Sequence, residues 1–159
     1  MTKTLVAYFS ASGVTKAVAE NLAKVAEADI YEIKPAKPYT DADLNWLDKN
    51  ARSTVEMKDW NSRPEIIEDD AHIENYDTIF VGFPIWWYIA PTIINTFLEK
   101  YDFANKKIIL FATSGGSSFG RTVENIRPSV DASTDIIEGK ILNHNPSLEN
   151  IKAWVDTLV

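Results

Sequence analysis

Short runs of apolar residues alternate along this chain with longer segments in which apolar residues recur every three or four positions. Residues 4–9 form the first such run, and residues 14–26 follow with helical spacing. Residues 29–33 alternate polar with apolar side chains, as a half-buried edge strand does, before Pro35 and Pro38 end the pattern. The opening of the chain therefore predicts a strand, a helix and an edge strand.

Two later segments, residues 77–83 and 106–113, each contain a continuous apolar run, which is typical of strands buried on both faces of a parallel sheet. We expect the first of them to lie centrally. The other expected elements are a helix after Pro91, a helix over 119–127 ended by Pro128, a weaker strand near 135–137 and a last helix from Ser147. Strand and helix alternate about five times, which favours parallel strands with right-handed crossovers and helices on both faces, a doubly wound α/β sheet.

The segment 35–76 is longer than one crossover helix needs, so we interpret it as an elaboration of the fold. Thr40–Asp43 resembles a helix cap, and apolar residues over 44–55 continue at near-helical spacing. An acidic surface segment is expected to follow, from Glu65 to Glu74. The length of 159 residues and the absence of a linker or repeat predict one domain over 1–159.

The charge balance narrows the range of partners. With 16 basic and 23 acidic residues the net charge is −7, so nucleic acid and anionic membrane surfaces would be repelled. The run 79–94 is interrupted by Pro84 and Pro91 and is too short to span a bilayer. The chain has no Cys and opens without a signal-peptide pattern, so we expect a cytoplasmic protein without nucleic-acid or membrane partners.

The loop after the first strand, residues 10–15, combines hydroxyl groups with a glycine at the start of a helix. Unpaired N–H groups and the positive end of the helix dipole bind phosphate there without a lysine. The loop lacks the lysine of nucleoside-triphosphate loops and the three glycines of dinucleotide loops, so a terminal monophosphate suits it best. Ordinary helix capping is the alternative, and the position beyond a strand's carboxyl end favours the ligand.

Two further loops leave strands at the same edge. Pro84–Tyr88 contains three adjacent aromatic residues, which would suit a flat, mostly apolar ring system, although at least one tryptophan can simply fill space between helix and sheet. The glycine-rich loop 113–120 would let main-chain N–H groups reach the polar edge of such a ring. The three loops together predict a site for a phosphorylated planar ligand.

The motifs S-A-S-G-V-T at 10–15, V-G-F-P-I-W-W at 81–87, A-P at 90–91 and T-S-G-G-S at 113–117 resemble the flavodoxin family, in particular its short-chain bacterial branch. Flavodoxin is itself the standard example of a five-stranded sheet of order 2-1-3-4-5 with FMN at its switch point, so the resemblance implies that order and that cofactor. The cofactor-binding residues it implies are Ser10, Ala11, Ser12, Gly13, Val14, Thr15, Pro84, Ile85, Trp86, Trp87, Tyr88, Thr113, Ser114, Gly115, Gly116 and Ser117.

One departure from the family pattern concerns the outer face of the flavin. No aromatic residue occupies 115–117, where well-studied flavodoxins stack a tyrosine, so Trp46 or another residue of 40–62 could cover that face. A core position for Trp46 is the alternative. We expect no catalytic base, because the chemistry belongs to the flavin. We expect no metal site, because His72 and His144 lie apart in the sequence without metal-ligand spacing.

Three functions follow from these patterns. The first is electron transport by a flavoprotein that docks with basic surfaces of a reductase and an acceptor. The second is an oxidoreductase in the stricter sense, an NAD(P)H-dependent FMN reductase of quinones or similar small acceptors. The third is a binding module without FMN, against which the first loop argues.

Overall fold

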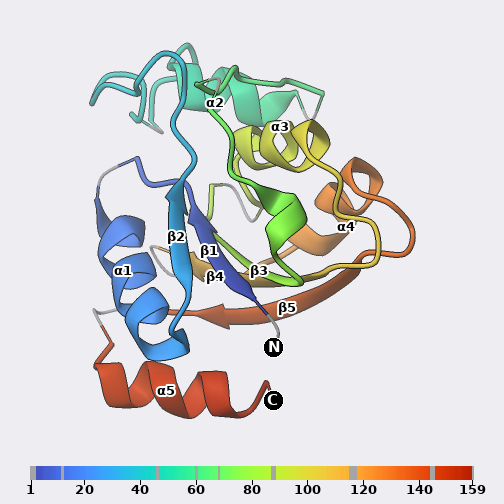
Figure 1. Ribbon diagram of the computed structural model, residues 1–159. Helices are drawn as coiled ribbons and strands as arrows, with labels where there is room; N and C mark the ends of the chain where they lie inside the picture. Colours follow the sequence, from blue (N-terminus) through green and yellow to red (C-terminus); the bar gives the residue numbers. More distant parts are fainter. Residues whose placement is uncertain are drawn as a thin grey trace.

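Five parallel strands form the centre of the computed structural model, which describes residues 3–11, 13–45, 47–59, 61–67, 69–86, 89–114, 118–143 and 146–158 (Figure 1). Their order is β2-β1-β3-β4-β5. The strands are β1 (Thr4–Tyr8), β2 (Asp29–Glu32), β3 (Thr78–Pro84), β4 (Lys107–Thr113) and β5 (Asp135–Ile141). This confirms the doubly wound sheet of order 2-1-3-4-5, with β2 at an edge and β3 at the centre.

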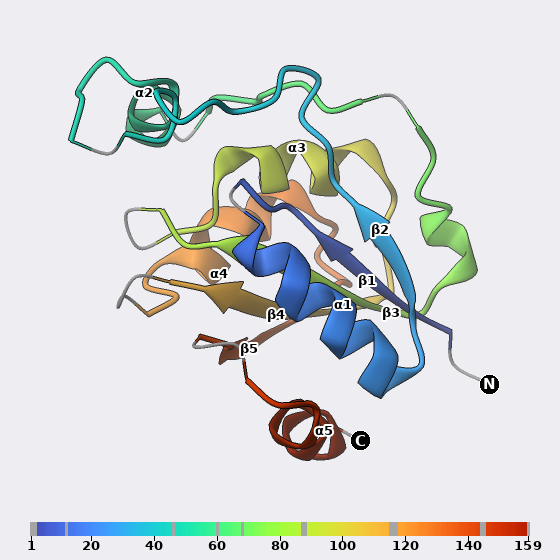
Figure 2. The same cartoon turned by 90° about the vertical axis from the view of Figure 1, so that its left-hand side faces the viewer.

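Helices cover both faces of the sheet. They are α1 (Val14–Ala26), α2 (Arg52–Lys58), α3 (Thr92–Lys100), α4 (Thr122–Ile126) and α5 (Leu148–Asp156), with short 3₁₀ helices η1 (Ile73–Asn75) and η2 (Arg127–Ser129). Figures 1 and 2 show α1 and α5 on one face and α3 and α4 on the other, with α2 displaced beyond the carboxyl end of the sheet. None of the helices in the described part of the chain is long and apolar enough to cross a membrane.

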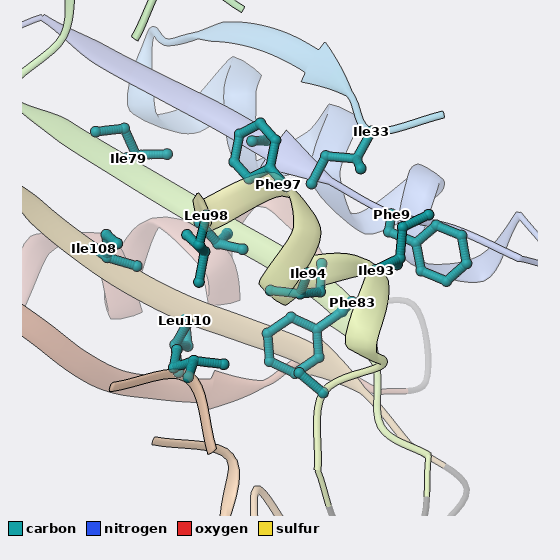
Figure 3. Close-up of a cluster of buried hydrophobic side chains, with 14 of the residues drawn as sticks. Phe9, Ile33, Ile79, Phe83, Ile93, Ile94, Phe97, Leu98, Ile108 and Leu110 are labelled. Atoms are coloured by element: carbon teal, nitrogen blue, oxygen red, sulfur yellow. The ribbon is translucent and has the colours of Figure 1, made fainter. Parts of the chain in front are cut away.

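Alternation along the strands divides the apolar residues between two cores. Leu5 and Ala7 of β1 belong to the cluster under α3, whereas Val6 and Tyr8 belong to the cluster under α1 and α5. Figure 3 shows the α3 side, where the helix packs on residues of β3 and β4 and on the segments that follow β1 and β2. The labelled residues of that core are Phe9, Ile33, Ile79, Phe83, Ile93, Ile94, Phe97, Leu98, Ile108 and Leu110.

Two glycines permit close packing against this sheet. A Cβ atom on Gly82 of β3 would lie 2.1 Å from the Phe111 ring of β4. At Gly139 of β5 a Cβ would lie 2.0 Å from the Leu110 carbonyl oxygen, at a β-bulge where the register of β4 and β5 shifts. The position beside the Phe111 ring and the position at the bulge therefore both require glycine, which has no side chain.

The prediction of a helix over 44–55 is wrong. Thr40 and Asp43 do form a reciprocal cap, since Thr40 N–H donates to Asp43 Oδ2 (3.0 Å) and Asp43 N–H donates to Thr40 Oγ1 (3.1 Å). The chain then passes through turns, and α2 begins only at Arg52. Asn45 and Asp48 accept from the backbone N–H groups two residues ahead, which competes with helical bonding.

The boundaries of the other helices and strands differ less from those predicted by sequence. β5 continues to Ile141, well beyond the expected 135–137, and Pro128 lies inside η2 after α4 ends at Ile126. The cap of the last helix is confirmed, because Ser147 Oγ accepts from Asn150 N–H at 3.1 Å. The acidic surface segment is confirmed for its described acidic residues, since Glu65, Asp69, Asp70 and Glu74 are all exposed.

Candidate functional site

The three loops singled out by sequence meet at the carboxyl edge of the sheet, because they follow the neighbouring strands β1, β3 and β4. Ile85 N–H donates to the Thr113 carbonyl oxygen (2.9 Å), which joins the second loop to the third. Thr15 Oγ1 and Thr113 Oγ1 lie 2.7 Å apart, which joins the first loop to the third. Residues separated by up to 98 positions are thus hydrogen-bonded within one site.

The first loop leaves backbone donors at the start of α1. Gly13 is the N-cap with φ of 92°, a left-handed conformation that favours glycine, and its own N–H donates to Ser10 Oγ (3.0 Å). The first intrahelical bond runs from Ala17 N–H to the Gly13 carbonyl (3.2 Å). The N–H groups of the three residues between them have no intrahelical partner, and no acidic residue occupies the first turn. The loop therefore presents donors suited to an anion.

Hydrogen bonds from neighbouring elements hold the first and third loops in place. Thr15 and Thr113 are buried and bonded to each other, so the Thr15 hydroxyl holds the loop against β4 and keeps two further hydrogen-bonding positions. Ser114 N–H donates to Asn143 Oδ1 (2.8 Å), which ties the third loop to the segment after β5. Sequence analysis missed Asn143, since only the tertiary structure brings it beside β4.

The second loop is closed by a pair of backbone bonds. Trp86 N–H donates to the Ile89 carbonyl (3.0 Å), and Ile89 N–H donates to the Trp86 carbonyl (3.2 Å). The Trp86 ring packs edge-on against Phe9, with centroids 5.8 Å apart, and against Tyr39, at 5.5 Å. Trp86 therefore packs in an aromatic cluster with Phe9 and Tyr39, and its contact with a cofactor stays a prediction.

Tyr39 is a site residue that sequence analysis missed. Its ring completes the aromatic cluster with Phe9 and Trp86, and the Arg52 guanidinium lies over it, 3.8 Å from the centroid. Its hydroxyl donates to Glu56 Oε1 (2.5 Å), and Arg52 Nε donates to Glu56 Oε2 (3.0 Å). Burial, followed by the bond to Glu56, raises the pKa of Tyr39. The only feature of the sequence that could have indicated this role is the aromatic residue directly after Pro38.

Several expected residues lie outside the described residues. They are Ser12, Trp46, Trp87, Tyr88, Gly115, Gly116, Ser117 and His144. Of the expected site residues, the structure brings together Ser10, Ala11, Gly13, Val14, Thr15, Pro84, Ile85, Trp86, Thr113 and Ser114 around the carboxyl ends of β1, β3 and β4.

His72 has neighbours that its sequence position did not suggest. Its Nδ1 lies 3.3 Å from Asp70 Oδ2 and 3.6 Å from Glu74 Oε1. All three side chains are exposed, so ordinary surface contacts between a histidine and two carboxyl groups account for the cluster.

Known proteins share this fold. A flavodoxin family model matches residues 3–158. Crystal structures of proteins assigned as flavoproteins from Bacteroides uniformis ATCC 8492 and Bacteroides eggerthii DSM 20697 are 47% and 43% identical, with TM-scores of 0.89 and 0.87. The first alignment covers 98% of both chains, and the second covers 99% of this chain and 98% of the other.

Two more distant similarities bear on chemistry. A flavoprotein from Lactobacillus acidophilus NCFM, solved in complex with FMN, is 25% identical over 98% of this chain and 99% of its own, with a TM-score of 0.72. NAD(P)H dehydrogenase (quinone) 1 of Cavia porcellus is 26% identical over 117 residues, which are 59% of this chain and 42% of that enzyme. The match thus spans less than half the length of the enzyme. From the match over nearly all of its length, the chain belongs to the flavodoxin family.

Proposed function

We propose that the chain binds FMN without a covalent bond and carries electrons between protein partners. The observation that carries this proposal is the first loop, where uncapped N–H groups of α1 adjoin loops from β3 and β4. A helix N-terminus of this kind binds a monophosphate without a lysine. The FMN-bound relative from Lactobacillus acidophilus supports the same cofactor.

The residues present suit this cofactor. Among the residues that the structure describes, a Cβ atom on Gly13 would meet nothing within 4 Å, so none of them fills the space beside this backbone position. Ser10, Ser12, Gly13, Val14 and Thr15 would hold the phosphate, and the ring would lie between Pro84–Tyr88 and Thr113–Ser117. When bound, FMN supplies one- and two-electron transfer, and the chain tunes that chemistry through packing, hydrogen bonds and charge.

Charge sets the expected redox behaviour. The chain carries a net charge of −7, and carboxylates near a reduced ring would oppose its negative charge. We therefore expect a low potential for the second electron. Docking on basic surfaces of a reductase and an acceptor should weaken as salt rises.

A titration with FMN tests the proposal. Wild-type apoprotein should quench flavin fluorescence on binding and turn yellow. Gly13→Ala should weaken FMN binding about tenfold, because an alanine resists the left-handed conformation at this position by about 1–2 kcal/mol. Lys24→Gln, an exposed change in the last turn of α1, is the matched control and should bind as wild type does. Wild-type protein that is colourless after incubation with millimolar FMN and removal of the free flavin would favour the FMN-free binding module instead.

A second candidate is an NAD(P)H-dependent FMN reductase of quinones or similar small acceptors. The 117-residue similarity to NAD(P)H dehydrogenase (quinone) 1 favours it. Steady-state oxidation of NAD(P)H with a quinone, measured on FMN-loaded protein with and without an added flavodoxin reductase, separates the two. Turnover that needs no reductase would identify the enzyme, and turnover that depends on the reductase would identify the electron carrier.

A further inference from the structure

A cavity of about 430 Å³ lies between the end of β5 and α5. Figures 1 and 2 both show α5 beside β5, on the face of the sheet that α1 also covers. None of the described residues expected to bind the cofactor lines this cavity. The residues that give it its chemistry come from β5, the segment after it and α5: Lys140, Leu142, Asn143, Pro146, Asn150 and Trp154.

The strand register places a lysine on the face of the sheet that α5 covers. Lys140 of β5 pairs with Phe111 of β4, and Phe111 belongs to the core under α1 and α5. Because paired residues of neighbouring strands share one face of the sheet, the Lys140 side chain lies on that face too. Lys140 is exposed and lines the cavity, so its ammonium group is available to a ligand there.

The polar side chains of the lining present hydrogen-bond donors. Asn143 Oδ1 accepts from Ser114 N–H (2.8 Å), which leaves the Asn143 Nδ2 group to donate elsewhere. Within the described part of the chain, that group and the side chains of Lys140 and Asn150 form no hydrogen bond or ion pair. Lys140 is also the only charged residue among the described residues of the lining, in a chain of net charge −7. A carboxylate, which accepts hydrogen bonds and carries a negative charge, matches this set of donors.

Apolar side chains form the rest of the lining. Leu142 and Trp154 belong to the core under α1 and α5, and the Trp154 ring is held edge-on against Phe80, with centroids 5.8 Å apart. The Trp154 indole and the Pro146 ring offer flat apolar surfaces to a ligand. The volume of about 430 Å³ falls within the range of roughly 300–1,000 Å³ that is typical of small-molecule sites. The cavity therefore suits a small, flat, apolar body with one carboxylate.

We propose that this cavity binds a small aromatic monocarboxylate, with its carboxylate at Lys140 and its ring against Trp154. This binding site goes beyond the proposed electron-transfer function and does not depend on it. Because Asn143 also holds the third loop through Ser114, the ligand would contact a support of the flavin site without entering that site.

Calorimetric titration with 2-naphthoate, and with 2-naphthylmethanol as its uncharged analogue, tests this proposal. Wild-type protein should bind one 2-naphthoate and bind the alcohol about tenfold more weakly. Lys140→Met should weaken 2-naphthoate about tenfold, the loss expected for one charge-assisted hydrogen bond, and affect the alcohol less. Ala153→Trp fills the cavity from an exposed position on α5 and should weaken both probes. Lys152→Met removes a lysine of α5 that does not line the cavity, so it is the matched control and should bind as wild type does.

Repeating the titrations with added FMN separates this cavity from the flavin site. The affinity for 2-naphthoate should stay within twofold when FMN is present. Displacement of 2-naphthoate by FMN, with affinity lost in Gly13→Ala and kept in Lys140→Met, would place the probe in the flavin site and overturn the proposal. Wild-type protein that does not bind 2-naphthoate at millimolar concentration, or binding that Lys140→Met and Ala153→Trp both leave unchanged, would also overturn it. Failure to bind FMN would contradict the proposed function alone.

Discussion

The strands β1, β3 and β4 and the crossover excursion over 37–64 are held in place by different forces. The central residues of these strands are buried on both faces, and several have no exposed surface. The excursion contains one seven-residue helix, α2, and many exposed residues, among them Leu47 at 74% exposure and Val55 at 54%. It leaves and rejoins the fold beside β2, where Pro35 and Ile66 form an antiparallel bridge.

A few directional contacts attach this excursion. Tyr39 packs on Phe9 and Trp86, Ser62 Oγ lies 2.8 Å from Thr92 Oγ1, and Arg63 forms two bonds of 3.0 Å to Glu99 of α3. Burial of apolar surface stabilises the sheet, whereas a few individual side-chain contacts hold the excursion in place. We therefore expect changes in the sheet to alter global stability and changes in the excursion to alter local opening near the site.

The largest effect is expected from Gly82→Ala in β3. The new Cβ would lie 2.1 Å from the Phe111 ring, which is fully buried and has no room to move. Overpacking of this kind should cost about 3 kcal/mol in the free energy of unfolding, measured with urea. Adding Phe111→Leu should recover part of this loss, because it removes the ring. Equal stability of Gly82→Ala and wild type would show that the sheet is not packed as described.

Tyr39→Ala tests the aromatic attachment of the excursion. It should cost about 2 kcal/mol, less than a core deletion because Tyr39 is only partly buried. Amides over 41–59 should exchange with solvent much faster, while those of β3 and β4 keep their protection. Tyr39→Phe, which keeps the ring and loses the bond to Glu56, is the matched control and should open the excursion less. Uniform loss of protection across the sheet would contradict the separation of the two regions.

Alkaline titration examines the core below α1. Burial, helped by the Glu32 and Glu20 charges, raises the pKa of Tyr8 to about 12. The folded state therefore keeps a proton that the unfolded state releases near pH 10. Stability should be complete below pH 10 and fall as pH rises towards 12. Tyr8→Phe should remove part of this decline in unfolding curves measured from pH 8 to 12, and an unchanged decline would exclude Tyr8 as its source.

The smallest effect is expected from Arg63→Gln. The ion pair with Glu99 is partly exposed, so its loss should cost less than about 1 kcal/mol. Hydrogen bonding by Arg63 lowers the pKa of Glu99, so the stabilisation is present above the unfolded-state pKa of about 4.3 and is lost as pH falls through the folded value. The difference in unfolding free energy between Arg63→Gln and wild type should thus disappear in acid. A difference that persists at pH 2 would show that the Arg63 side chain stabilises the fold through packing.

Local sequence patterns predicted the sheet and its helices well, because burial imposes a visible period on the residues. The helix over 14–26 and the Ser147 cap of the last helix both appear where spacing and capping residues placed them. The excursion was predicted poorly. Its residues at helical spacing, such as Leu47, bury no common face, and Asn45 and Asp48 bond to nearby backbone groups instead.

The sequence by itself determined the alternation of strands and helices, the central position of β3 and the loops from which a phosphate site can be built. Each of these depends on residues close together in the chain. Only the tertiary structure decided that Thr15 bonds Thr113, that Asn143 holds Ser114, and that Tyr39 joins Phe9 and Trp86. These contacts join residues whose separation carries no periodic signal, so they arise only when the parallel strands bring their carboxyl ends to one edge.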